Sequence, residues 1–164
     1  MFSKGDRVVY PHHGGAVIED VVERESFGKP RSYFKLRLPH GDLTIMVPVD
    51  GTEDVGLRGV VSRGDLDKVF DLLHEDEGGM PDLWSQRYKT NLAKLISGDI
   101  YLLAEVVRDL SLRETRKGVS VAERRMLAKA RQILISELTL VVDSTEENAE
   151  AMLDEVLASR SSPL

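Results

Sequence analysis

Trp84-Ser85-Gln86-Arg87-Tyr88-Lys89 is the segment around which this chain is organised. It contains the only tryptophan, it is expected to open a helix, and it begins the one strongly basic region of a protein whose net charge is −6. Residues 84–131 carry 11 Lys and Arg against 5 Asp and Glu, a net charge of +6. Because charges more than about 8–10 Å apart are largely screened, this region can attract an anionic partner although the whole chain is acidic.

Length and composition limit the classes of protein to which the chain can belong. Its 164 residues suffice for one domain or two small ones, with a sizeable hydrophobic core. There is no cysteine, which excludes disulfide bonds and thiolate chemistry and fits a reducing cytosol. No apolar run reaches membrane-spanning length, and the N-terminus lacks a signal-peptide pattern. We therefore expect a soluble, cytoplasmic protein with no membrane partner.

Residues 1–61 have the pattern of a small β domain. Apolar and polar residues alternate or form short β-branched runs, and Gly- and Pro-containing turns separate these runs. The expected strands are Arg7–Tyr10, 16–22, 33–38 and 43–48, and the expected turns are His12–Gly15, Gly28–Pro30 and His40–Asp42. Several short strands of this kind predict a small barrel or a strongly bent sheet, which Val55–Arg58 would close.

From Ser62 onward the apolar spacing becomes helical. Ser62 is expected to cap a first helix, and the acidic segment Glu75–Asp82 follows as a linker, near which we place the domain boundary. Further helices are expected at 84–97, at 99–117, from the capping box at Ser120 to about 140, and from a second capping box at Ser144 to 157. The sequence thus predicts an α+β protein with an N-terminal β domain (1–61), a helix and acidic linker (62–82) and an all-α domain (83–164).

The helix expected from Val121 separates an apolar face from a basic one. At about 100° per residue one face gathers Met126, Leu127, Ala130, Ile133, Leu134, Leu138 and Val141. The outer face and its flanks gather Arg124, Arg125, Lys129 and Arg131. Glu123 is the only acid expected near these cations, unlike the alternating charges of a solvated helix. We therefore favour a phosphate-binding surface over an ordinary solvated face, although most charged runs are solvated faces.

Trp84 has two possible roles. A large aromatic side chain is more often buried in a core than exposed to a ligand, so spacing alone favours a packing role. Alternatively, an aromatic at a helix start, flanked by Arg87 and Lys89, can stack on or insert between bases while the cations hold phosphates.

No catalytic or metal-binding pattern is present. His12 and His13 are adjacent in sequence, and neighbours in a chain rarely face one metal together. No Cys/His spacing fits zinc, and no Gly-rich segment matches a phosphate loop. We therefore expect neither an enzyme nor a cofactor or metal.

Several motifs, in order along almost the whole chain, resemble the CarD/CdnL family of bacterial RNA polymerase-binding transcription regulators, and most closely its actinobacterial branch. Two of them lie in the N-terminal part, at Gly5–Gly14 (GDRVVYPHHG) and Val55–Arg58 (VGLR). The other three lie in the C-terminal part, at Trp84–Lys89 (WSQRYK), Ala104–Leu110 (AEVVRDL) and Arg125–Arg131 (RMLAKAR).

This resemblance implies a Tudor-like N-terminal domain that binds the RNA polymerase β subunit. It also implies a helical domain that contacts promoter DNA near the minus-ten element, at the upstream edge of the bubble, and stabilises the open complex. The family's wedging tryptophan matches Trp84, and its basic DNA contacts match Arg87, Lys89 and Arg124. One polymerase-contacting arginine matches Arg24. The other is replaced by Met46, which puts the strength of that contact in question.

Two other functions remain open from the sequence. One is a protein–protein adaptor without direct DNA contact, in which Trp84 is buried. The other is a small-barrel RNA-binding protein, but such a protein should be basic in residues 1–61, which carry 8 Lys and Arg against 9 Asp and Glu. We expect a monomer, while the responding promoters and the direction of regulation stay open.

Overall fold

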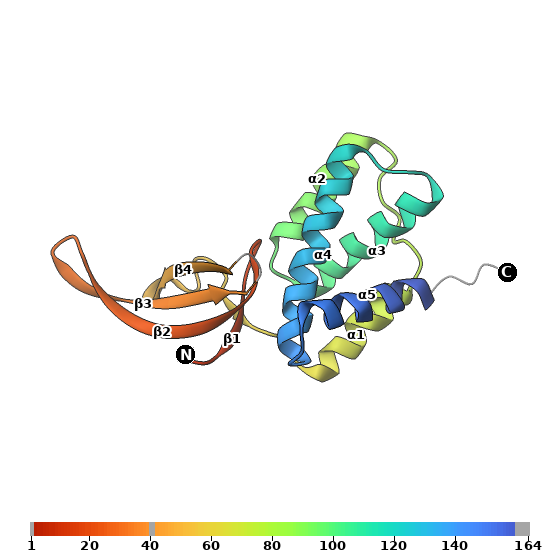
Figure 1. Cartoon of the computed structure of the whole chain (residues 1–164). Helices are drawn as coiled ribbons and strands as arrows, with labels where there is room; N and C mark the ends of the chain where they lie inside the picture. Colours follow the sequence, from red (N-terminus) through yellow and green to blue (C-terminus); the bar gives the residue numbers. More distant parts are fainter. Residues whose placement is uncertain (1, 40–41, 160–164) are drawn as a thin grey trace.

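The N-terminal part of the chain forms one antiparallel five-stranded sheet in the computed structural model, which describes residues 2–39 and 42–159. The sheet order is β4-β3-β2-β1-β5, so that β4 forms one edge (Figure 1). The strands are β1 (Arg7–Tyr10), β2 (Gly14–Ser26), β3 (Lys29–Leu38), β4 (Leu43–Pro48) and β5 (Arg58–Gly59), with a 3-10 turn, η2 (Val49–Gly51), after β4.

All four predicted strands form, but β2 and β3 are longer than predicted, and β2 already begins at Gly14, within the turn predicted at His12–Gly15. Of the predicted closing segment Val55–Arg58, only Arg58 pairs with β1. The turn predicted at Gly28–Pro30 lies earlier, at Phe27 and Gly28, because Lys29 already pairs with Ser26. Part of the turn predicted at His40–Asp42 lies outside the described residues. A register shift between Ile18 and Asp20 marks a β-bulge in β2, which bends the sheet.

One face of the sheet is apolar and buried. Alternation along the strands places Val8, Ile18, Phe34, Leu36 and Val47 on it, each at most 2% exposed. Because the period of a strand is two residues, the intervening side chains form the opposite, outer face.

Five helices follow the sheet: α1 (Arg63–His74), α2 (Trp84–Ile96), α3 (Ile100–Arg116), α4 (Val121–Val141) and α5 (Glu146–Ser159). Ser62 caps α1, Asp99 caps α3, and Ser120 forms a complete capping box with Glu123, as predicted. At α5 the predicted cap was one residue too early, because the hydroxyl of Thr145, not of Ser144, accepts the Asn148 N–H.

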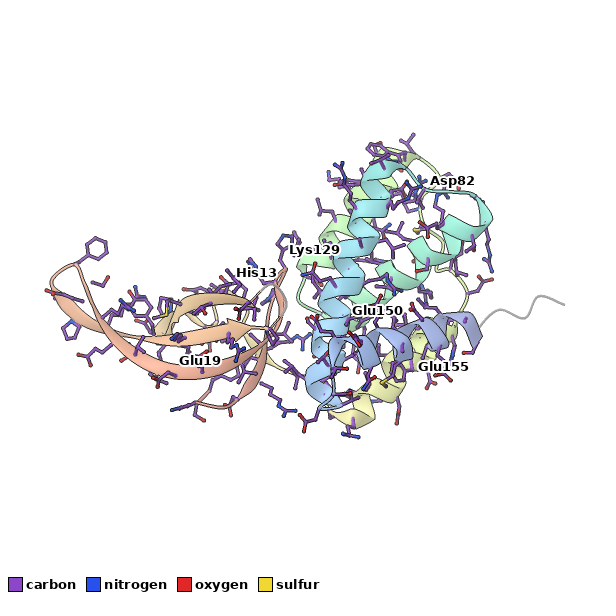
Figure 2. All side chains as sticks on the ribbon, in the orientation of Figure 1. His13, Glu19, Asp82, Lys129, Glu150 and Glu155 are labelled. Atoms are coloured by element: carbon purple, nitrogen blue, oxygen red, sulfur yellow. The ribbon has the colours of Figure 1, made fainter. Side chains whose placement is uncertain are left out.

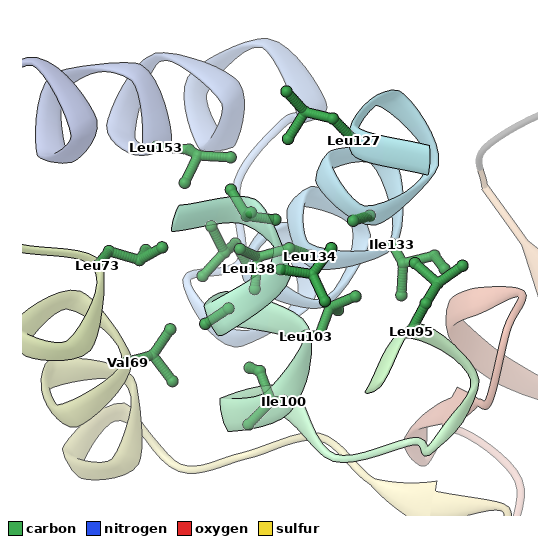
Figure 3. Packing of buried hydrophobic residues seen from close by; sticks show 14 of the residues in the cluster. Val69, Leu73, Leu95, Ile100, Leu103, Leu127, Ile133, Leu134, Leu138 and Leu153 are labelled. Atoms are coloured by element: carbon green, nitrogen blue, oxygen red, sulfur yellow. The ribbon is translucent and has the colours of Figure 1, made fainter. Parts of the chain in front are cut away.

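The helices share one apolar core (Figure 3). Val69 and Leu73 of α1 point into it together with Leu134 and Leu138 of α4 and Leu153 of α5. The helical core therefore begins with α1, on the N-terminal side of the acidic linker. The sheet has a separate core, and the C-terminal half of α4 lies against the start of β2 where the two parts meet (Figure 1).

Candidate interaction surfaces

Trp84 is the first residue of α2 and lies at the surface, with 46% of the residue exposed. Its indole Nε1–H donates a hydrogen bond to Ser120 Oγ at 2.9 Å. Its ring stacks on Tyr88, with the ring centroids 5.5 Å apart and an interplanar angle of 23°. The core burial that spacing alone favoured is therefore not observed: the ring lies outside the core, but it packs on Tyr88 and its orientation is fixed from two sides.

A buried ion pair between α2 and α4 supports the position of Trp84. Arg87 and Glu123 are 4% and 1% exposed, and the guanidinium Nε and Nη2 donate to the two carboxylate oxygens at 2.6 and 3.1 Å. Arg87 Nη1 also donates to the Asp82 carbonyl at 3.0 Å. Glu123 in turn accepts the N–H of Ser120, the residue that holds Trp84. We call Trp84, Arg87, Ser120 and Glu123 the α2–α4 network.

The electrostatics of the pair follow from its geometry. The hydrogen bond from Arg87 is the largest influence that lowers the pKa of Glu123 below its ordinary value of 4.5, against an opposing effect of burial. The same hydrogen bond raises the pKa of Arg87. Both groups are thus charged at neutral pH, and Arg87 is enclosed by its partners. It is not placed like a phosphate-contacting cation, in contrast to the role that the family resemblance implied.

Three of the candidate cations on α2 and α4 have no carboxylate partner in the part of the chain that the structure describes. Lys89 is exposed on α2, Arg125 is exposed on α4, and Lys129 is half-buried one turn after Arg125. Figure 2 shows Lys129 beside His13 at the junction of sheet and helices. Burial, and then the charges of His12 and Lys129, lower the pKa of His13, so its ring is neutral at pH 7 and the positive charge there is that of Lys129.

The other two candidate cations of α4 do have acidic neighbours, which corrects the expectation that Glu123 is the only one. Arg131 Nη2 donates to Asp154 Oδ1 at 2.7 Å, and its side chain is only 22% exposed. Arg124 lies 3.7 Å from Glu114 but keeps 63% of its side chain exposed. The partners come from α5 and α3, so the sequence of α4 alone could not reveal them.

The candidate polymerase residues lie on the outer face of the sheet. Opposite residues of antiparallel strands share a face. Arg24 pairs with Arg31 of β3, and Met46 pairs with Lys35 of β3. Lys35 follows Arg31 by four residues, an even number, so the two side chains lie on the same face of the sheet. The structure thus places Arg24 and Met46 on one face. The same register also places Asp20, Val22, Arg31, Tyr33, Lys35, Arg37, Thr44 and Pro48 there, and we call this whole set the outer sheet face.

Sequence reasoning did not identify two features of these surfaces. Arg31 lies over the ring of Tyr33 at 5.8 Å in the middle of the outer sheet face. Phe27, at the tip of the β2–β3 hairpin, is fully exposed (102%) and has a φ of 52°. The dipeptide Phe27-Gly28 between two predicted strands could have indicated a hairpin tip, but the exposure of the Phe27 ring could not be predicted from the sequence.

The fold and its surfaces define a two-domain protein that binds other macromolecules. Residues 2–61 match the CarD-like/TRCF RID domain, and residues 68–154 match the C-terminal domain of CarD. The chain is 33% identical over 151 residues to YdeB of Bacillus subtilis (strain 168), a candidate transcription factor, over 92% of this chain and 99% of YdeB. The chain belongs to the CarD/CdnL family and is a CarD-like transcription regulator that interacts with RNA polymerase.

None of the helices between residues 63 and 159 is both long enough and apolar enough to cross a membrane.

Proposed function

We propose that this regulator binds the polymerase β subunit through its outer sheet face and promoter DNA through the surface around Trp84, and that it stabilises the open complex. The observation that carries the proposal is an exposed tryptophan whose ring is held by Ser120 and Tyr88. A ring that is exposed but already oriented loses little rotamer entropy when it stacks on or wedges between bases.

Polymerase binding is supported by the composition of the outer sheet face. Aromatic and arginine side chains are enriched in protein interfaces, and this face centres on Tyr33 between Arg24, Arg31 and Lys35. Lys35 lies directly opposite Met46, so it places a cation, in an exposed pair with Glu19 at 3.3 Å, close to the position where the family has its second arginine. The exposed ring of Phe27 extends the face with an apolar contact at the hairpin tip.

DNA binding is assigned to Trp84 and to four cations of α2 and α4. Lys89, Arg125 and Lys129 have no acidic partner among the described residues, so no ion pair is broken when they bind phosphate. Arg124 is largely exposed, and an exposed pair with Glu114 at 3.7 Å is worth only about 0–1 kcal/mol, so this arginine can turn to a phosphate. Arg87 acts instead as a positioning residue for Trp84, and Arg131 packs α4 against α5.

The energetics favour action at an opened promoter. Inserting a ring at a base step costs roughly a few kcal/mol of unstacking, which is smaller where the strands have already separated. A factor that binds the open state more tightly than the closed state shifts their equilibrium by that difference in affinity. Anchoring on polymerase raises the local concentration of the helical domain near the DNA, so its own affinity for DNA can be low.

The proposal is tested by the lifetime of open complexes formed with polymerase from the same organism. Wild type should lengthen the lifetime, and Trp84→Ala should not. Ile96→Ala is the matched control, because Ile96 is another exposed apolar side chain of α2, three turns from Trp84, and should behave as wild type. If wild type leaves the lifetime unchanged, the proposal is wrong and an adaptor role without DNA contact takes its place.

A further inference from the structure

Two of the sequence motifs belong to neither proposed surface. Gly5–Gly14 and Val55–Arg58 lie away from the outer sheet face and from Trp84, where the sheet meets α4 and the α2–α3 turn. Their contacts show that they build the interdomain joint, by which we mean Gly14, Gly15, Arg58, Ser136 and Glu137.

Arg58 crosses from the sheet to two places in the helical domain. Its Nη1 and Nη2 donate to the two carboxylate oxygens of Glu137 at 2.8 and 2.7 Å, and its Nε donates to the Gly98 carbonyl at 2.6 Å. Glu137 is 1% exposed and also accepts the Val61 N–H at 2.9 Å. A bidentate pair of this kind has one favourable geometry, so it fixes the angle between the groups as well as their distance.

The second contact of the joint is a close backbone approach. Gly15 N–H donates to Ser136 Oγ at 2.7 Å, and this hydroxyl donates to the Ile133 carbonyl. A Cβ added at Gly15 would lie 2.8 Å from both the Ser136 carbonyl oxygen and Leu140 Cδ1, closer than real Cβ contacts. Only glycine therefore lets the start of β2 lie this close to α4.

The joint is closely packed on the side of Pro11 and Ile133, while an open groove lined by Gly59, Val60 and Ser97 lies next to Arg58. The cavity between Pro11, Arg58, Gly98 and Ile133 measures about 10 Å³, at or below the space that one water needs. Contacts between domains of one chain usually permit relative motion unless they are large and apolar. Here a partly buried ion pair and a glycine contact replace a large apolar area.

We propose that the joint holds the two domains in a single orientation, and that Gly15, Arg58 and Glu137 are positioning residues that set where Trp84 meets the promoter. The inference rests on the proposed function. A flexible tether would only raise the local concentration of the helical domain. A rigid joint also fixes the position and orientation of Trp84 relative to the sheet. Trp84 lies about 20 Å from the joint, because the 13-residue helix α2 separates them.

Gly15→Ala tests the joint with the smallest possible change. Its matched control is Gly59→Ala, a glycine of the same sheet whose added Cβ would meet nothing within 4 Å. Neither position has a positive φ, so alanine causes no backbone strain at either. The chain has no cysteine, so Asp54→Cys and Glu155→Cys place one spin label in each domain for distance measurement.

In the full chain, Gly15→Ala should shift or broaden the distance between the labels, and Gly59→Ala should not. Affinity for the β subunit and for a short DNA duplex should stay unchanged, because neither proposed surface is touched. The open-complex lifetime on polymerase should nevertheless fall to that of polymerase alone. Loss of lifetime together with intact binding of both partners is a result that a merely unfolded variant cannot give.

Arg58→Met combined with Glu137→Gln is a second variant in case Gly15→Ala does not fold. It removes the ion pair without leaving a lone buried charge, and the glutamine oxygen can still accept the Val61 N–H. A normal lifetime in a variant whose label distances have changed would overturn the inference, as would unchanged distances in both variants. If the proposed function itself is wrong, the wild-type protein will already leave the open-complex lifetime unchanged, so the two failures can be told apart.

Discussion

Phe27 occupies a backbone conformation that phenylalanine adopts only at a cost. Its φ of 52° and that of Gly28, 77°, are both positive in a two-residue loop between the paired residues Ser26 and Lys29. Such hairpin turns prefer Asn-Gly, because asparagine tolerates this region and a bulky side chain does not. The ring also gains nothing from burial within this chain, since it is fully exposed. Because of this strain and exposure, we expect Phe27 to contact a partner.

Replacing Phe27 should therefore change stability and binding in opposite directions. Phe27→Asn should raise the stability of the sheet by about 1 kcal/mol, because it relieves the positive-φ strain. It should also weaken binding to the β subunit, measured by titration of the full chain. Phe27→Ala is the control: it removes the ring but leaves a non-glycine residue with the unfavourable φ, so binding should fall without the gain in stability. Unchanged binding in both variants would remove the hairpin tip from the polymerase contact.

At the scale of elements, the α2–α4 network is a pH-dependent link between two helices. The pKa of Glu123 is lowered in the folded protein, first by the hydrogen bond from Arg87. A lowered carboxyl pKa stabilises the fold fully above the unfolded value of 4.5, and this contribution is lost as the pH falls through the lowered folded value.

Glu123→Gln should destabilise the helical domain by about 3 kcal/mol at pH 7, because it leaves the buried charge of Arg87 without its counter-ion. The difference from wild type should shrink as the pH falls below 4.5. Thermal unfolding of both proteins between pH 3 and pH 7 measures it, and Glu114→Gln, which touches only the exposed pair with Arg124, should show neither effect. A pH-independent difference would mean that the ion pair is not its cause.

The elements themselves were largely predictable, whereas the pairs between them were not. Strand alternation and the caps at Ser62, Asp99 and Ser120 are local signals, and the structure confirms them. The ion pairs that decide which cations are available join residues 23, 36 and 79 positions apart. They are Arg131–Asp154, Arg87–Glu123 and Arg58–Glu137. The apolar spacing within one helix carries no information about an ion-pair partner on another helix. The burial of Arg87 and the contacts of the interdomain joint could therefore be seen only in the structure.

At the scale of the whole molecule, the distribution of charge matters more than its sum. The protein carries a net charge of −6, yet the region that begins at Trp84 is positive, and the structure neutralises part of that region through α3 and α5. A protein of this kind should bind free DNA weakly and act on DNA when polymerase holds it there. Low intrinsic affinity also keeps the factor from occupying the many non-promoter sites of a genome.

The salt dependence of free DNA binding gives a direct measure of how many cations take part. The logarithm of the binding constant falls with the logarithm of salt concentration by about 0.9 for each phosphate that is neutralised. Four available cations, Lys89, Arg124, Arg125 and Lys129, therefore predict a slope of about −4 for the full chain on a short duplex. Arg125→Gln should reduce the slope by about 1, because one fewer counter-ion is released. Arg131→Gln should leave it unchanged and lower stability instead, because Asp154 already holds that guanidinium. A slope that falls equally in both variants would mean that the ion pairs of α4 open on DNA, and that charge count rather than the folded arrangement determines the contact.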